Sequence, residues 1–308
     1  MALLSRVYYN AVFGALGGLI GWMLFGVLAD RNSPGDSQTI LGGLLIGGFI
    51  GYFIVGAEAI RDRSLVRFCR LASYGVVLGS LGGAVGMWIG EQVHYKITQS
   101  LLDATMLRRI GEIVSRGLGW MLLGVAVGLS EGVASRSLGK LSYGSMGGAI
   151  GGLAGGIIYG IIKVVSDSSG PLHVWGGAIG LVILGACIGA LSALVQGVFL
   201  PASVRVLRGW QEGREYALSK KDNFLGRDEA ADIALFRDMR VEKRHAIIQR
   251  DGNRFMFVNN KAPLDQTLIN DQPVADLLQL KDGDRIQLGN VMLRFQAREA
   301  GSRQKTTV

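Results

Sequence analysis

Six long apolar stretches, almost free of charge, follow one another in the first two thirds of the chain. They cover residues 9–29, 40–60, 71–90, 117–133, 142–162 and 174–199. A helix rises about 1.5 Å per residue, so each stretch is long enough to cross about 30 Å of hydrocarbon. The pattern predicts a polytopic α-helical membrane domain of six helices over residues 1–205 and argues against a large soluble core. The first stretch is not a cleaved signal peptide, because five more follow it.

Basic residues gather in the short loops that follow the even-numbered stretches. Four arginines lie within 61–70, Arg136 and Lys140 follow the fourth stretch, and Arg205 and Arg208 follow the sixth. Because such residues stay on the cytoplasmic side, both termini are expected to be cytoplasmic. The loop 91–116 is a basic exception on the opposite side. We expect either a helix lying flat on the outer surface or a plain solvated loop.

Glycine makes up 47 of the 308 residues, and its positions repeat. The odd-numbered stretches share the pattern Y-x4-G-x2-G-G-x2-G, which begins at Tyr9, Tyr74 and Tyr143. The even-numbered stretches share a glycine followed seven residues later by a polar residue: Gly51 and Glu58, Gly124 and Glu131, Gly189 and Gln196. The sequence therefore predicts three tandem helical hairpins, at about 7–70, 71–139 and 140–205, related by an axis along the membrane normal.

The glycines offer a way for helices to associate in lipid. Small residues allow the close van der Waals contact that holds such helices together. The fifth stretch has a ridge with one glycine every fourth residue: Gly144, Gly148, Gly152, Gly156 and Gly160. We expect the odd-numbered helices to pack tightly together in the middle, and a homo-oligomer is a further expectation. The alternative is that the bare faces line a pore or a lipid groove.

Ionisable groups deep in a membrane usually mark ion pathways, and here the candidates are Glu58 and Glu131. Both lie near the cytoplasmic ends of their stretches, five residues before Arg63 and Arg136 respectively. We expect interfacial pairing with these arginines. A gating role is the alternative, although Gln196 in the third repeat excludes a symmetric ring of carboxylates.

Residues 206–300 have a different pattern, with short alternating runs separated by turn residues such as Asp251-Gly252-Asn253. The runs are 215–219, 233–235, 245–249, 254–258, 285–288 and 292–296. Several short strands at this spacing predict an all-β sandwich. Residues 301–308 are expected to form a flexible tail.

Five motifs in order make this segment similar to a forkhead-associated (FHA) domain. They are Phe-Leu-Gly-Arg at 224–227, Asp-Ile-Ala-Leu at 232–235, Val-Glu-Lys-Arg-His-Ala at 241–246, Thr-Leu-Ile-Asn at 267–270 and Leu-Lys-Asp-Gly-Asp-Arg-Ile-Gln-Leu-Gly at 280–289. The resemblance implies two twisted sheets that bind phosphothreonine peptides through loops at one end. With the low cysteine content, it also suggests a bacterial cytoplasmic (inner) membrane.

The resemblance also implies individual roles. Gly226 and His245 are expected to be structural, and Arg227 is expected to help hold a phosphate. However, Glu242 replaces the family's serine, and Asp265 replaces its asparagine. At ~4 Å and a surface-like dielectric, each carboxylate would repel a unit charge by about 4 kcal/mol before screening. We therefore expect these loops to bind a cytoplasmic protein, phosphorylated or not, without the usual phosphothreonine dependence. The binding residues by resemblance are Arg227, Glu242, Lys243, Arg244, Asp265 and Asn270.

Other function classes lack support in the sequence. The two cysteines, Cys69 and Cys187, and three scattered histidines predict no metal site, and no phosphate-binding loop or catalytic set occurs, so no cofactor is expected. The net charge of +8 is not clustered as nucleic-acid binding requires. We expect a non-enzymatic scaffold or signalling adaptor that contacts membrane lipid and docks a protein. The alternative is an oligomeric channel or membrane-remodelling protein, with the FHA-like domain as gate or assembly contact; a small transporter is a weaker option.

Overall fold

The computed structural model describes residues 3–28, 35–62, 65–100, 105–167, 172–229, 231–252 and 254–297. The predicted tail at 301–308 lies outside these residues. The chain divides between Val198 and Phe199 into two compact units, one helical and one built of strands.

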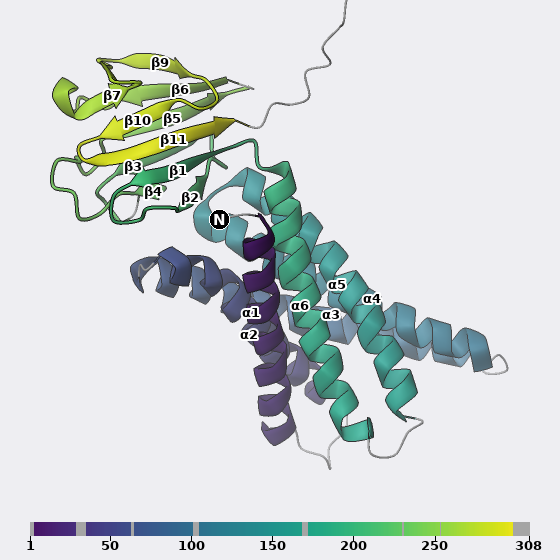
Figure 1. The fold of residues 1–308 in the computed structure, drawn as a ribbon. Coiled ribbons are helices and arrows are strands. Elements are labelled where there is room, and N and C mark those ends of the chain that lie inside the picture. Colours follow the sequence, from purple (N-terminus) through teal and green to yellow (C-terminus); the bar gives the residue numbers. More distant parts are fainter. Residues whose placement is uncertain are drawn as a thin grey trace, which may run out of the picture. The chain divides into compact units, whose positions relative to one another are not determined.

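The first unit contains the six predicted helices (Figure 1). They are α1 (Leu3–Leu28), α2 (Asp36–Asp62), α3 (Leu65–Ser100), α4 (Thr105–Ser135), α5 (Leu138–Asp167) and α6 (Leu172–Phe199). Each is long and apolar enough to cross a membrane. The predicted six-helix membrane domain is therefore confirmed.

Of the two alternatives for residues 91–116, the plain solvated loop was wrong, because the described residues 91–100 and 105–116 are helical. Helix α3 continues to Ser100, and α4 already begins at Thr105. With 36 residues, α3 is about 54 Å long, more than the ~30 Å of hydrocarbon that it must cross. In Figure 1 the last turns of α3 and the first turns of α4 extend together past the neighbouring helices. Gly111 of α4 faces the side chain of Ile97 of α3, so the apolar helical period of this segment serves helix pairing.

The centre of the bundle is formed by the even-numbered helices, which corrects the expectation that the odd-numbered helices pack there. Ile50 of α2, Leu123 of α4 and Ile188 of α6 are fully buried and belong to one core cluster. In the membrane-spanning windows of α2, α4 and α6, 61%, 50% and 50% of residues are buried, against 22%, 28% and 33% in α1, α3 and α5. The large apolar side chains of the even-numbered helices fill the middle.

The odd-numbered helices lie outside, each against two even-numbered helices, and their paired glycines make both contacts. The first row of glycines on each odd-numbered helix faces the even-numbered helix before it, and for α1 this helix is α6. A Cβ added to a glycine of this row would collide with a backbone carbonyl there: Gly14 with Gly185, Gly79 with Gly47, and Gly148 with Gly124. The other row meets the following even-numbered helix: Gly17 meets Ile50, Gly82 meets Ala126, and Gly151 meets Ile188. The six helices therefore contact one another in a closed circuit, and the two rows account for the adjacent glycines of the shared pattern.

The contacts change one alignment made from the sequence. Gly51 meets Gly75 and Gly189 meets Asn10, but the position opposite Gly144 is Gly128 rather than Gly124. Gly128 lies one helical turn beyond the glycine that aligns with Gly51 and Gly189 in sequence. Sequence spacing alone does not reveal this, because α4 carries glycines at both positions.

The second unit is a sandwich of two sheets. Its strands are β1 (Ala202–Arg208), β2 (Glu215–Ala217), β3 (Asp222–Gly226), β4 (Ile233–Ala234), β5 (Ala246–Asp251), β6 (Arg254–Asn259), β7 (Thr267–Ile269), β8 (Gln272–Pro273), β9 (Leu277–Leu280), β10 (Arg285–Leu288) and β11 (Val291–Ala297). One sheet has the order β2-β1-β11-β10-β7-β8 and the other β4-β3-β5-β6-β9. The buried Val204, Leu225, Phe257 and Phe295 form part of one core, so the predicted sandwich is confirmed.

Strand β1 begins before residue 206, where we placed the domain boundary. It pairs antiparallel with β11 from Ala202 opposite Ala297. Ala202, Val204 and Val206 form one buried face of the strand, while on its other face Ser203 is buried and Arg205 is exposed. In the sequence, Arg205 and Arg208 resemble the basic residues that follow a membrane span. For this reason the start of the strand was not predicted.

The glycine contacts predict opposite effects for one substitution at two sites. Gly152→Ala places a methyl group against the carbonyl oxygen of Trp120, whereas Gly26 has no atom near its Cβ position. Overpacking typically costs ~1–3 kcal/mol, while Ala favours an open helical site by roughly 1 kcal/mol. In detergent, Gly152→Ala should lower the melting temperature of the full chain, and Gly26→Ala should leave it unchanged or raise it. Equal melting temperatures for both variants would contradict the packing.

Candidate functional site

Two loops at one end of the sandwich are joined through their backbones. The N–H of Arg227, just after β3, donates to the carbonyl of Glu242 at 2.9 Å, and the N–H of Asp228 donates to that of Lys243 at 3.3 Å. A Cβ at Gly226 would collide with the Lys243 carbonyl, so this close approach requires glycine. The Gly-Arg pair is thereby fixed beside the segment before β5.

His245 links these loops to a third segment. Its side chain is fully buried. Its Nδ1 accepts a hydrogen bond from the backbone N–H of Glu242 at 3.1 Å, and its Nε2 lies 2.9 Å from Oγ1 of Thr267. The Thr267 hydroxyl donates to the carbonyl of Pro263 at 3.0 Å. The network thus assigns the proton of a neutral imidazole to Nε2, and His245 holds three loops in place.

Burial lowers the pKa of His245 below its ordinary value, and the negative charges of Glu242 and Asp238 oppose this only in part. A protonated ring could not accept the hydrogen bond from Glu242. The loop arrangement therefore depends on the neutral form of His245.

The charged side chains around this centre face solvent. Glu242, Lys243, Arg244 and Asp265 are exposed, and Arg227 is half-buried. Asp265 lies in a short 3-10 helix, Leu264–Gln266, directly before β7 and Thr267. Both carboxylates that replace the family's polar residues thus flank the centre held by His245. The loop end carries mixed charge.

Arg227 is partly engaged within the domain. Its Nη1 lies 2.6 Å from the sulfur of Met239, whose side chain is 80% exposed. The backbone N–H of Arg227 is bonded to Glu242, which places these two residues next to each other. A ligand phosphate approaching Arg227 would therefore also meet the region of Glu242.

Asn270 is placed elsewhere, in the tight turn between β7 and β8. It has a φ of 50°, and Asp271 beside it has a φ of 67°. The Asn270 side chain donates to Asp284 at 2.9 Å and accepts from the N–H of Arg285 at 3.0 Å. Its contacts hold two turns together, and the structure does not bring it into the three-loop cluster.

Two features of the loop end were not singled out from the sequence. Asp238 accepts hydrogen bonds from the backbone N–H groups of Arg240 and Asn290, which braces the loop before β5 against the β10–β11 turn. Arg237 stacks on the half-exposed ring of Trp210, with its guanidinium carbon 3.5 Å from the ring centre. The Asp238–Asn290 and Arg237–Trp210 contacts join residues distant in sequence, so no short motif marks them.

In the membrane domain, the sequence reasoning was wrong about the partner of Glu131. Its carboxylate forms an ion pair with Nζ of Lys140 from α5 at 3.1 Å and accepts a hydrogen bond from the side-chain amide of Gln196 from α6 at 2.9 Å. The predicted partner was Arg136. Glu131 is 9% exposed, so the charge is compensated in a buried setting. The side chains of Glu58 and Arg63 lie outside the described residues. Lys140 and Gln196 thus bind Glu131 within a contact between three helices.

His245 predicts a specific pH dependence for the isolated domain. Because its folded pKa is lowered, the unfolded chain binds more protons, so stability is complete above the unfolded value of ~6.5 and falls as pH drops from there toward the folded pKa. Urea unfolding between pH 7.5 and 5.5 should show a decline of at most ~1.4 kcal/mol per pH unit.

The matched variant is His245→Gln, since the domain contains no second histidine. It should be less stable at pH 7.5 but nearly independent of pH in this window. The same decline in wild type and variant would show that another group is responsible.

Comparisons with known proteins address the C-terminal unit. The family model described as "Inner membrane component of T3SS, cytoplasmic domain" matches residues 205–299. A comparison with curated proteins finds no match.

Similar solved structures are FHA domains. One, from work on phosphothreonine-dependent FHA domain interactions, is 30% identical, covering 32% of this chain and 97% of its own, with a TM-score of 0.29. The FHA domain of CT664 from Chlamydia trachomatis is 20% identical (32% and 98% covered, TM-score 0.30). The N-terminal FHA domain of Rad53p from S. cerevisiae, solved with a phosphothreonine peptide, is 20% identical (32% and 94% covered, TM-score 0.29).

The five ordered motifs, the two-sheet topology and the family match together identify the second unit. The C-terminal unit of this six-helix membrane protein is a forkhead-associated domain.

Proposed function

We propose that the chain is a non-enzymatic, membrane-anchored scaffold whose FHA domain docks a protein partner from the cytoplasm without the usual phosphothreonine dependence. The observation that carries the proposal is the loop end itself. Its framework of Gly226 and His245 is intact, while Glu242 and Asp265 present carboxylates beside it. A surface held this rigidly suits recognition, and its charge disfavours a dianion.

The family match supports an assembly role. The matched family is described as the cytoplasmic domain of an inner-membrane component, so it too pairs a domain of this type with a membrane. This also supports an inner-membrane location for the present chain. The basic short loops at the even-numbered helix ends favour a cytoplasmic FHA domain.

The membrane domain supports an anchor. Ile50, Leu123, Leu184 and Ile188 are fully buried in its central cluster, so bulky apolar side chains occupy the middle of the bundle. The glycine rows that we considered for a pore face instead lie against neighbouring helices. These contacts favour a compact anchor over a conduit within one chain.

Calorimetry on the isolated domain tests the phosphate independence. Wild type should bind phosphothreonine peptides no better than their unphosphorylated forms, and Arg227→Ala should change little. Glu242→Ser with Asp265→Asn should create phosphate-dependent binding, because each charge-assisted hydrogen bond contributes ~1.5–3 kcal/mol. Adding Arg227→Ala to this double variant should abolish that binding.

The matched control is Asp251→Asn with Asp271→Asn, which removes two negative charges in the β5–β6 and β7–β8 turns. It should not create phosphate-dependent binding. Micromolar, phosphate-dependent binding by wild type that Arg227→Ala abolishes would overturn the proposal and define an ordinary phosphothreonine reader.

A further inference from the structure

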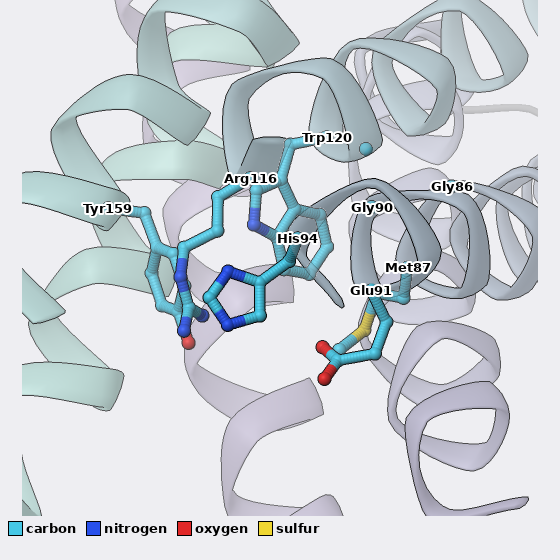
Figure 2. A pocket seen from close by; sticks show the side chains of 9 residues that line it. Gly86, Met87, Gly90, Glu91, His94, Arg116, Trp120 and Tyr159 are labelled. Atoms are coloured by element: carbon cyan, nitrogen blue, oxygen red, sulfur yellow. The ribbon is translucent and has the colours of Figure 1, made fainter. Parts of the chain in front are cut away.

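A pocket open to solvent lies between α3, α4 and α5 of the membrane domain (Figure 2). Part of its wall is bare backbone, because α3 and α4 approach each other through Gly86, Gly90 and Gly119. Trp120 and Tyr159 supply aromatic walls.

Three polar side chains line this pocket: Glu91 and His94 from α3, and Arg116 from α4. Figure 2 shows His94 between Glu91 and the Arg116–Tyr159 pair. Nδ1 of His94 is buried and has no hydrogen-bond partner among the described residues. Within the same residues neither Glu91 nor Arg116 forms an ion pair. The pocket thus holds donors and acceptors that the protein itself leaves available.

We place the pocket near the boundary between membrane and water from the positions of its charged residues in the sequence. Glu91 directly follows the apolar stretch 71–90 of α3, and Arg116 directly precedes the stretch 117–133 of α4. Trp120 is buried in the central core cluster and Tyr159 packs against it, so the inner wall of the pocket belongs to the core of the bundle. A lipid bound here could keep its acyl chains in the bilayer while its headgroup enters the pocket.

The charges select the kind of headgroup. An arginine is suited to a phosphate, since its planar guanidinium offers parallel N–H donors, and the free ring nitrogen of His94 can join it. The Glu91 carboxylate accepts hydrogen bonds from an ammonium group. One cation and one anion balance each other, which matches a zwitterion better than an anionic lipid.

The contact between Arg116 and Tyr159 favours a primary over a quaternary ammonium group in the ligand. The Arg116 guanidinium carbon already lies 5.8 Å from the centre of that ring, so the ring face is engaged by a cation of the protein. A quaternary ammonium relies on such faces and cannot donate to Glu91, whereas a primary ammonium can. We propose that this pocket binds the phosphoethanolamine headgroup of a phospholipid, with the phosphate at Arg116 and His94 and the ammonium at Glu91.

Native mass spectrometry of the full chain in detergent tests the proposal. Equimolar phosphatidylethanolamine, phosphatidylcholine and phosphatidylglycerol with the same acyl chains are supplied together. Phosphatidylethanolamine should be retained with roughly tenfold preference, the ratio that one charge-assisted hydrogen bond supplies. Equal retention of all three lipids, or a preference for phosphatidylglycerol, would overturn the proposal.

Variants locate the binding. Arg116→Gln should reduce retention of phosphatidylethanolamine and phosphatidylglycerol alike. Glu91→Gln, at an exposed position that folding should tolerate, should remove the preference over phosphatidylcholine. The matched control is Arg109→Gln, an exposed arginine of α4 outside the pocket lining, which should retain the wild-type preference. An unchanged preference in Glu91→Gln would overturn the proposal even if Arg116→Gln failed to fold.

A soluble competitor distinguishes binding of a phospholipid from binding of free phosphoethanolamine. Free phosphoethanolamine in large excess should not displace the lipid, because it lacks acyl chains that hold it in the bilayer. Displacement at concentrations close to that of the lipid would show that the pocket serves a soluble compound and would overturn the assignment to a phospholipid.

Discussion

Contact between helix backbones is the interaction on which the membrane domain depends. In lipid, apolar helices gain no hydrophobic free energy by burying apolar surface against each other. Their association therefore depends on close van der Waals contact. The paired glycine rows of α1, α3 and α5 permit it on two sides, and each of these helices lies against two even-numbered ones. The bulky side chains needed to fill the interior must then come from α2, α4 and α6. Glycine thus makes the contacts of the odd-numbered helices, and bulky side chains of the even-numbered helices fill the centre.

The sequence predicted the six helices and the sandwich because both have strong local signals: apolar length in one case and period-two alternation in the other. It could not predict which helices occupy the centre, since a glycine row fits a central or an outer helix equally well. It could not predict that Gly128 rather than Gly124 lies opposite Gly144, because α4 carries glycines at both positions. Strand β1 escaped notice because Arg205, exposed on a half-buried strand, also resembles the end of a membrane span.

The candidate sites were predictable to different extents. Family resemblance placed Gly226, Arg227 and His245 together, and the contacts of Gly226 and His245 show how the loops are held. It could not place Asn270, whose turn uses the side chain for its own hydrogen bonds. In the membrane domain, spacing favoured Arg136 as the partner of Glu131, but Lys140 and Gln196 come from other helices. The pocket at Glu91, His94 and Arg116 was hidden because this segment looked like a loop.

The most direct test of the central claim is carbene footprinting of the full chain from a photoreactive lipid within a bilayer. If the even-numbered helices form the centre, the exposed Val77, Val85, Ile150 and Ile161 on α3 and α5 should be labelled. The fully buried Ile50, Leu123 and Ile188 should be protected. Labelling of these three residues as strong as that of the α3 and α5 positions would contradict the account.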